Sequence, residues 1–435
     1  MRFLVDLFYL LAVILVTPVL LYRMLVSGKY RSGWLERLGY LPDLPESSSI
    51  WPRVWIHAVS VGELNAVRGL IAAWRKESPE SSFLVSTTTD TGYARARELF
   101  PDLIVVRYPL DMSRFVRRAL NRVGPRLIVL VELEVWYQFV TQAARQNIPV
   151  AVINGRLSAK SIKWFNRIGP LSRRMFGALR WVGAQDEEYA ERFRQAGVPA
   201  GQVEVMGSLK WDTAEIADEL AGTDELARAM GIGRRRPVWV CGSTGPGEEK
   251  VILQAYQTLH RRHPTLQLVI VPRKPERFDE VANLIRQTGY QVIRRSESPD
   301  GTTRPPAVKS VMLGDTMGEL RKFYFLASVV FVGRSLAAMG GSDMMEVAAL
   351  AKPIVVGPHN ENFADIVAKF QKHQAIRVLS KDLESPDVLA SLTRVVAQLV
   401  DNPTPARQLA DNARAVVQAN RGATKRTLKY LMEMV

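Results

Sequence analysis

Short apolar runs alternate with amphipathic stretches along most of this 435-residue chain, and this alternation constrains its fold more than any other feature. One series of runs extends from Val54 to Val205, and a second extends from Val238 to Val378. Strands that alternate with helices over such lengths form a parallel sheet covered by helices on both faces. The sequence therefore predicts two doubly wound α/β domains that face a cleft, with ligand sites at the carboxyl ends of both sheets.

The domain boundaries are predicted from changes in composition. The stretch 212–236 between the two series is charged and contains glycine, which suits a hinge. The last residues form an amphipathic pattern that predicts one helix, packed back toward the first domain. The predicted division is a membrane anchor at 1–25, a first Rossmann-like domain at 26–215, a second Rossmann-like domain at 216–404 and the C-terminal helix at 405–435.

Residues 3–22 are mostly apolar and carry a single charge, at Asp6. Twenty such residues are long enough to span a bilayer as a helix. A cleaved signal peptide is the weaker interpretation, because no small-x-small site precedes the basic segment 23–37. A helix buried against the first domain is the structural alternative. With an anchor, the basic flank predicts a protein of the inner membrane whose domains face the cytoplasm.

The chain carries a formal net charge of +15, which suits nucleic acid, an anionic membrane or an anionic substrate as partner. The segment 159–181 is basic, contains no acid and interleaves aromatic residues, so it favours an anionic membrane surface. Nucleic acid and a solvated helix are the alternatives, and the predicted anchor argues against nucleic acid. The lone cysteine, Cys241, excludes an intrachain disulfide and indicates a reduced compartment.

Three acids and a lysine follow strands of the first series. Glu63 lies just after the first strand, where a carboxylate can act as general base on a hydroxyl. The spacing Ser60-x-x-Glu63 is also that of a helix capping box. Glu132 and Glu134 follow another strand, where one can orient a reacting group and the other can pair with an arginine, unless both are merely solvated. Lys210 can neutralise a leaving phosphate.

The second series carries glycine-rich loops after its strands. The stretch 331–363 predicts strand, loop, helix and strand, with Glu346 on the first helical turn, where its carboxylate can accept hydrogen bonds from a ribose diol. Gly333 and Gly340 are predicted to let the backbone approach a ligand, and the loop 241–249 can hold charged groups of a donor. The alternative is a tight strand–helix connection with Glu346 favoured only by the helix dipole.

Together these motifs resemble the Kdo transferase family, whose members act with 3-deoxy-D-manno-octulosonic acid (Kdo) in lipopolysaccharide inner-core biosynthesis. The resemblance is carried, in order, by HAVSVGE, TTTDTGY, YPLD, ELEVW, NGRLS, GSLKWD, GSTGPGEE, VPRKPERF, GDTMGEL and GGSDMMEVAALAKPIVVGPHNENF. It implies a GT-B fold, in which the domain at 26–215 binds the acceptor and the domain at 216–404 binds the CMP-sugar. It also implies transfer from CMP-Kdo to a lipid A precursor. It further implies inversion at the anomeric carbon without a metal or other cofactor, and the chain contains no D-x-D metal motif.

The resemblance also implies roles for individual residues. Glu63 matches the catalytic base, and Glu132 and Lys210 match positions that stabilise the transition state. The positions that match CMP-binding segments are Pro272, Arg273, Met317, Gly318, Glu319, Asp343, Met344, Met345 and Glu346.

The chain departs from the family pattern at a few positions. Ser342 and Asp343 stand where the family usually has His-Asn, and Lys274 stands where a His is usual. Asp343 adds a negative charge beside a site for an anionic nucleotide, and Arg334 can offset it. Ser342 and Asp343 favour one rival function, a transferase for another CMP-activated acidic sugar. A rival of a different class is a non-catalytic membrane-bound protein that binds nucleotide or lipid.

Overall fold

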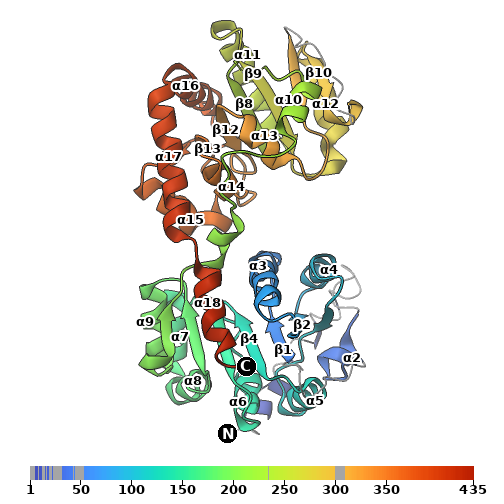
Figure 1. The fold of residues 1–435 in the computed structure, drawn as a ribbon, viewed down its shortest axis with the longest axis vertical. Helices are drawn as coiled ribbons and strands as arrows, with labels where there is room; N and C mark the ends of the chain where they lie inside the picture. Colours follow the sequence, from blue (N-terminus) through green and yellow to red (C-terminus); the bar gives the residue numbers. More distant parts are fainter. Residues whose placement is uncertain are drawn as a thin grey trace. The chain divides into compact units, whose positions relative to one another are not determined.

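The computed structural model describes residues 5–7, 9–11, 15, 17–18, 22, 32–42, 44, 53–233, 235–298 and 309–435. The chain divides into two compact units, and each is drawn in Figure 1. Unit 1 comprises Met1–Thr213 and Asn420–Val435, and unit 2 comprises Ala214–Ala419.

Unit 1 is built on a seven-stranded parallel sheet in the order β3-β2-β1-β4-β5-β6-β7. Its strands are β1 (Arg53–His57), β2 (Ser82–Thr87), β3 (Ile104–Arg107), β4 (Leu127–Val131), β5 (Val150–Gly155), β6 (Trp181–Ala184) and β7 (Val203–Val205). Its helices are α2 (Trp34–Arg37), α3 (Val61–Glu77), α4 (Asp90–Leu99), α5 (Ser113–Val123), α6 (Tyr137–Arg145), α7 (Ala159–Arg167), α8 (Gly169–Phe176), α9 (Glu187–Ala196), α18 (Ala423–Met432) and the short η2 (Leu209–Thr213).

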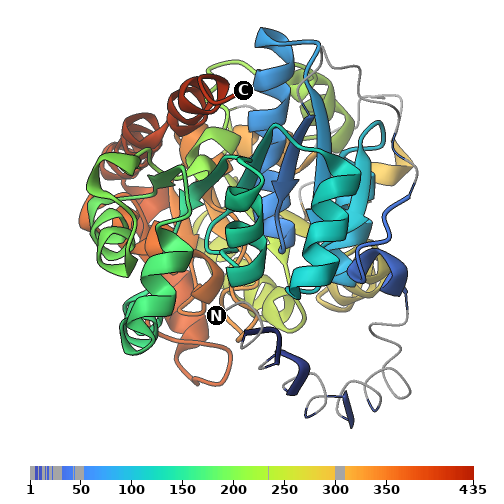
Figure 2. The same cartoon turned by 90° about the horizontal axis from the view of Figure 1, so that it is seen from below.

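Helices cover both faces of this sheet, as the blue to green elements in Figure 2 show. Successive side chains of a strand point to opposite faces, and β1 follows this rule: Trp55 packs in one core, while Val54 and Ile56 pack in the other. All five residues of β4 are buried apolar residues, as expected for a central parallel strand with both faces covered. The predicted doubly wound architecture is therefore confirmed for this unit.

Unit 2 repeats the architecture with the strand order β10-β11-β9-β8-β12-β13-β14. Its strands are β8 (Val238–Thr244), β9 (Gln267–Pro272), β10 (Gln291–Arg294), β11 (Ser310–Leu313), β12 (Val329–Val332), β13 (Ile354–Val356) and β14 (Arg377–Val378). Its helices are α10 (Thr223–Met230), α11 (Glu248–Arg262), α12 (Phe278–Gln287), α13 (Leu320–Leu326), α14 (Met345–Ala349), α15 (Ala364–Lys372), α16 (Val388–Asp401) and α17 (Pro403–Asn420), with the short η3 (Pro275–Arg277).

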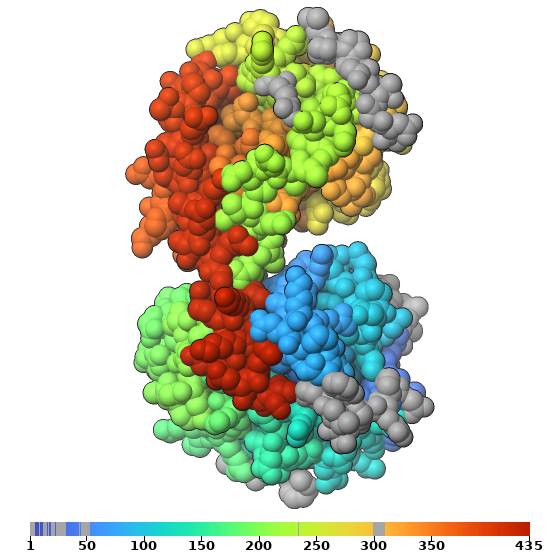
Figure 3. Space-filling model, viewed as in Figure 1, coloured from blue at the N-terminus to red at the C-terminus, as the bar shows by residue number. Residues whose placement is uncertain are grey.

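The predicted single C-terminal helix is two helices, α17 and α18. The break falls at Gly422, whose φ of 93° is costly for other residues and ends regular helix geometry. Asp212 accepts a hydrogen bond from the Gly422 N–H at 2.6 Å and fixes the start of α18. Ala423, Leu428 and Leu431 of α18 complete the apolar core beside α3, and Figure 3 shows the two helices in contact, in red and blue.

The stretch predicted as a hinge contains the helix α10, and its first residues are tied to unit 2. Arg321 pairs with Glu215 at 2.6 Å, and Arg414 pairs with Asp218 at 2.5 Å. The predicted membrane anchor lies largely outside the described residues. In the ranges that are described, no helix has both the length and the apolar character needed to cross a bilayer.

Candidate active site

The site residues of unit 1 lie where its strand order reverses. β1 pairs with β2 on one side and with β4 on the other, so the connections after β1 and β4 diverge at their carboxyl ends. Open α/β sheets bind ligands at such switch points. Glu63 follows β1 and Glu132 follows β4, and the fold thus brings these two predicted residues to one edge of the sheet.

The Glu63 side chain is held in one orientation by the start of α3. Its two oxygens accept hydrogen bonds from the backbone N–H of Val59, at 2.9 Å, and of Ser60, at 3.2 Å. The Ser60 hydroxyl in turn accepts one from the Glu63 N–H at 3.2 Å. The capping box anticipated as the alternative to a catalytic role is therefore present. It also fixes the carboxylate at the switch point, so the two roles are compatible.

The electrostatics of Glu63 suit proton transfer. The residue is only 8% exposed, and burial raises the pKa of its carboxyl above the ordinary value. Hydrogen bonds from Val59 and Ser60 oppose this rise, and the negative charges of Glu132 and Glu134 add to it. A carboxylate whose pKa moves toward neutrality is a stronger base, and this is the usual way in which a protein adapts a glutamate for general-base catalysis.

Glu132 is held in a network with Asn154 and Lys210. The Lys210 Nζ lies 3.7 Å from Glu132 Oε1, and the Asn154 amide donates to the same oxygen at 3.4 Å. The Asn154 Oδ1 accepts the Leu209 N–H at 3.1 Å and so anchors the segment that carries Lys210. Glu132 and Asn154 have φ values of 59° and 51°, in the left-handed region. Such strained backbone clusters at functional sites, where neighbours hold it in place.

Glu134 faces a buried histidine. Its Oε2 accepts a hydrogen bond from Trp136 Nε1 at 2.9 Å and lies 3.8 Å from His57 Nε2, too far for a hydrogen bond. His57 is fully buried and stacks on Tyr108 with ring centroids 3.7 Å apart. Burial favours the neutral form of Glu134, but His57 and Trp136 outweigh it and lower the pKa of Glu134.

The prediction that one of the paired acids meets an arginine is wrong, because their partners are Lys210 and His57. Sequence reasoning assigned no role to His57 or Asn154. Both lie at the carboxyl-terminal ends of strands that neighbour β4, His57 as the last residue of β1 and Asn154 as the residue before the last of β5. Each also lies within a motif that carried the family resemblance, which was the available signal.

Unit 2 reverses its strand order at β8, which pairs with β9 and β12. The buried Glu248 carboxylate joins the loops after β8 and β12. It accepts hydrogen bonds from four backbone N–H groups, those of Gly245, Arg334, Ser335 and Leu336, at 2.6–2.9 Å. These four amides are therefore engaged by Glu248, and the carboxylate ties the loop after β8 to the loop after β12.

The glycines of these loops lie directly against neighbouring parts of unit 2. A Cβ on Gly333 would lie 2.6 Å from the Thr244 Cα, and one on Gly340 would lie 2.1 Å from the Asn362 amide nitrogen. These glycines allow close approach of the protein's own loops. The Arg334 side chain donates to the Met339 carbonyl at 3.0 Å, which places it within the same loop.

Arg273 follows β9 and is exposed. Its backbone N–H donates to Thr244 O at 3.0 Å, and in the described part of the chain no carboxylate forms a salt bridge with its guanidinium. The loop is anchored a turn later by a buried bidentate pair between Arg277 and Glu249, at 2.6 and 3.1 Å. This anchor leaves Arg273 available to an anionic ligand, and its predicted contact with CMP stays a prediction.

Replacing Arg277 by methionine is expected to destabilise the protein by about 3–5 kcal/mol, because Glu249 would stay buried without its counter-charge. The midpoint of chemical denaturation measures this change. Arg262→Met is the matched control. Arg262 pairs with Asp401 at 2.9 Å but is 70% exposed, so its loss should cost no more than about 1 kcal/mol. Equal effects of the two substitutions would contradict the assignment of Arg277 as a buried anchor.

The remaining predicted nucleotide-binding residues lie on two loops of unit 2. Met317 is 66% exposed, and Gly318 has a φ of 85°. The Glu319 carboxylate is engaged by Arg295 and by the Thr316 hydroxyl, at 2.8 and 2.6 Å, so it shapes its loop. The assignment of these residues to CMP binding stays a prediction.

The segment 343–346 opens α14. The Asp343 side chain accepts the Met345 N–H at 2.8 Å, and Met344 and Met345 are buried. Glu346 lies in the first turn of α14, as predicted, and burial raises the pKa of its carboxyl. A half-buried carboxylate in this place can accept hydrogen bonds from a diol.

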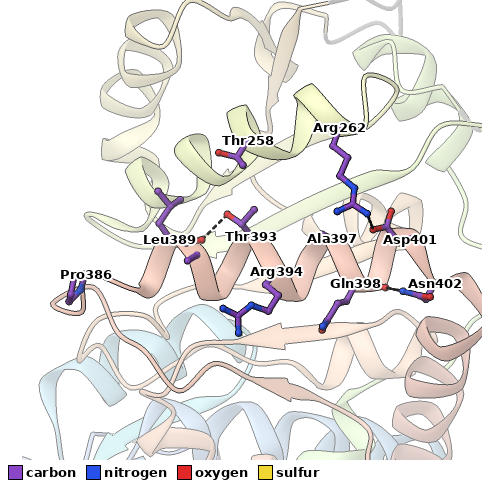
Figure 4. Close-up of a pocket in the computed structure, with 11 residues that line it drawn as sticks. Thr258, Arg262, Pro386, Leu389, Thr393, Arg394, Ala397, Gln398, Asp401 and Asn402 are labelled. Carbon is purple, nitrogen blue, oxygen red and sulfur yellow. Dashed lines mark hydrogen bonds and ion pairs between the residues drawn. The ribbon is translucent and has the colours of Figure 1, made fainter.

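A groove of about 730 Å³ runs between α11 and α16 of unit 2. Figure 4 shows its lining, which includes Thr258 and Thr393 and the Arg262–Asp401 pair. None of the predicted nucleotide-binding residues contributes to it. Within the described ranges, no three His, Cys, Asp or Glu side chains gather in a geometry that can hold a metal ion.

Comparison with known proteins agrees with this geometry. The chain shares its fold with the UDP-GlcNAc 2-epimerase of Neisseria meningitidis solved with UDP-GlcNAc (TM-score 0.56, 13% identity, covering 88% of this chain and 100% of that one). Two parallel α/β units of this kind, with a carboxylate cluster at a switch point, define a two-domain enzyme fold of the GT-B type.

Sequence comparison identifies the family. Residues 32–213 match the family model described as 3-deoxy-D-manno-octulosonic-acid transferase (kdotransferase). The chain is 33% identical to the 3-deoxy-D-manno-octulosonic acid transferase of Haemophilus influenzae over 93% of its length and 92% of that protein. It is 35% identical to the enzyme of the same name from Bordetella pertussis, over 87% of this chain and 86% of that one. The chain belongs to the Kdo transferase family.

Proposed function

We propose that this protein is a glycosyltransferase that moves Kdo from CMP-Kdo to a lipid A precursor in lipopolysaccharide inner-core biosynthesis. The observation that carries the proposal is the cluster of unit 1, in which the oriented, buried Glu63 lies near Glu132 and Glu134. Family membership supplies the identity of the sugar, and the cluster supplies the base that its transfer requires.

The proposed mechanism is a direct displacement. Glu63 accepts the proton of the acceptor hydroxyl as the hydroxyl oxygen attacks the anomeric carbon, and the bond from that carbon to the CMP phosphate breaks. One displacement inverts the anomeric configuration. Lys210, oriented by Glu132, offsets negative charge in the transition state, so that no metal ion or other cofactor is required.

We place the enzyme at the inner membrane, with its domains facing the cytoplasm and residues 3–22 as anchor. The basic helices α7 and α8 favour contact with anionic lipid, because Lys163, Arg167 and Arg174 are exposed and no acid lies between residues 159 and 181.

A transfer assay with full-length protein, a lipid A precursor and CMP-Kdo generated in situ tests the proposal. We expect a Kdo-bearing product, and we expect NMR to show that its anomeric configuration is inverted relative to the donor. The product should also form in the presence of EDTA. Binding of CMP without product would instead support the non-catalytic rival. An unchanged anomeric configuration would exclude the single displacement.

A second donor is worth testing because Asp343 is exposed beside Glu346 and adds negative charge at the predicted nucleotide site. The rival function is transfer of another CMP-activated acidic sugar. In a competition between CMP-Kdo and CMP-sialic acid we expect only Kdo to be transferred. Preferential use of the second donor would replace Kdo in the proposal.

A further inference from the structure

An apolar cavity of about 730 Å³ lies in unit 1, apart from the residues already given a catalytic role. Its walls come from the loop after β4, from α7 and α8, and from Val5 and Tyr9 of the N-terminal segment. The lining is mostly apolar and includes Leu133, Val135, Trp136, Leu171 and Met175. Its volume falls within the range of roughly 300–1,000 Å³ that ligand sites occupy.

The cavity and the carboxylate cluster of Glu63, Glu132 and Glu134 share the short loop after β4. Glu132 and Glu134 belong to the carboxylate cluster, and the residues that alternate with them, Leu133 and Val135, line the cavity. Trp136 belongs to both, because it lines the cavity and donates its indole N–H to Glu134 at 2.9 Å. A molecule that occupies the cavity is therefore next to the residues proposed to act on the acceptor.

The rim of the cavity combines exposed aromatic rings with positive charge. Trp136 is 42% exposed and Trp164 is 55% exposed, although both line the cavity. Large exposed apolar groups around a hollow mark a binding surface for an apolar ligand. Arg167 also lines the cavity, and Lys163 is exposed one turn earlier on α7. An apolar interior with a cationic rim is complementary to a molecule that has an acyl chain and an anionic head.

We propose that this cavity binds one acyl chain of the phosphorylated acceptor glycolipid and thereby positions its saccharide beside Glu63 and Glu134. This inference rests on the proposed function, since it assumes an acylated acceptor. The chain lies among Leu133, Val135 and Leu171, and Arg167 and Lys163 meet the phosphate. The cavity thus selects acceptors that carry an acyl chain over water-soluble saccharides.

The test compares two acceptors, the acylated precursor and the same phosphorylated saccharide with its acyl chains removed. Leu171→Trp fills part of the cavity and touches none of the proposed catalytic residues. We expect it to raise KM for the acylated acceptor about tenfold, the loss expected when roughly two methylene groups remain in water. Turnover of the deacylated saccharide should be unchanged. Val205→Trp, on the exposed edge strand β7, is the matched control. It should change neither the KM for the acylated acceptor nor the turnover of the deacylated saccharide.

Each other outcome is informative. Equal effects on both acceptors, or no effect on either, would overturn the proposal. Leu171→Asn adds no volume and should give the same selective rise in KM if the tryptophan variant does not fold. Reduced binding of Leu171→Trp to vesicles of anionic phospholipid without acceptor would identify a membrane-docking surface instead. If wild type transfers sugar to neither acceptor, the proposed function fails, which is distinct from failure of the cavity.

Discussion

Replacing Glu63 by glutamine is expected to lower kcat about 10²–10⁴-fold, the usual contribution of a general base. Glutamine keeps the length of the side chain and can still accept a hydrogen bond from the Val59 or Ser60 N–H, but it cannot take a proton at neutral pH. CMP binding, measured by calorimetry, should stay at the wild-type level. The kcat of the transfer assay is the quantity to compare.

The pH dependence gives an independent measure of the same role. Because the pKa of Glu63 is raised in the folded protein, the acidic limb of kcat should lie above the range of an ordinary glutamate, near pH 4.3. Activity rises with pH as the base loses its proton. Glu63→Gln should abolish this limb in its residual activity. A limb that persists unchanged would assign it to another group.

The raised pKa also fixes the sign of a stability effect. Glu63 binds a proton more tightly in the folded state than in the unfolded state. The protonated carboxyl therefore contributes its full stabilisation of the fold at pH values below the unfolded-state pKa. It is lost as pH rises through the folded pKa. Glutamine does not ionise, so the Glu63→Gln variant does not lose this stabilisation as the pH rises. We therefore expect Glu63→Gln to be no less stable than wild type at neutral pH.

Ser60→Ala is the matched control for the capping role. It removes the hydroxyl that accepts the Glu63 N–H but keeps the carboxylate, and it should cost about 0.5–2 kcal/mol of stability. Its kcat should stay within a few-fold of wild type. If Ser60→Ala loses as much activity as Glu63→Gln, sugar transfer depends on the capping box at the start of α3 and not on Glu63 as a general base.

The layered α/β architecture could be predicted from the sequence because each strand is marked by a short apolar run of its own. β4 is a continuous apolar run, and a run that is buried on both faces must be a central parallel strand. The division of the C-terminal region was missed because it depends on one residue, Gly422, whose backbone Asp212 holds from a distant part of the chain. Amphipathic spacing continues on both sides of that break and does not reveal it.

The candidate site was predictable residue by residue but not in its contacts. Glu63 and Glu132 could be placed because each directly follows a strand. The partners of the carboxylates depend on the register of β1, β4 and β5, which a single sequence does not specify. Asn154 and His57 were therefore missed as partners. For the same reason, the capture of four loop amides by Glu248 was not foreseen.

Replacing Lys210 by methionine is expected to lower kcat about 10²–10³-fold, as for the loss of one group that stabilises transition-state charge. Methionine keeps much of the side-chain volume and removes the ammonium group 3.7 Å from Glu132. Fold stability should change little, because the pair is partly exposed, with side-chain exposures of 31% and 23%. Lys210→Arg, which keeps the charge, is the control and should retain more activity.

The same substitution separates a direct role of Lys210 from one exerted through Glu63. Glu132 already raises the pKa of Glu63, and without Lys210 its charge is less compensated, so Lys210→Met should move the acidic limb of kcat to higher pH. Glu132→Gln should move the limb to lower pH. If Lys210 acts only by tuning Glu63, Lys210→Met should regain wild-type kcat at high pH, and the double variant should resemble Glu132→Gln. If it stabilises the transition state directly, the loss should persist on the plateau of both profiles, because raising the pH cannot replace the missing cation.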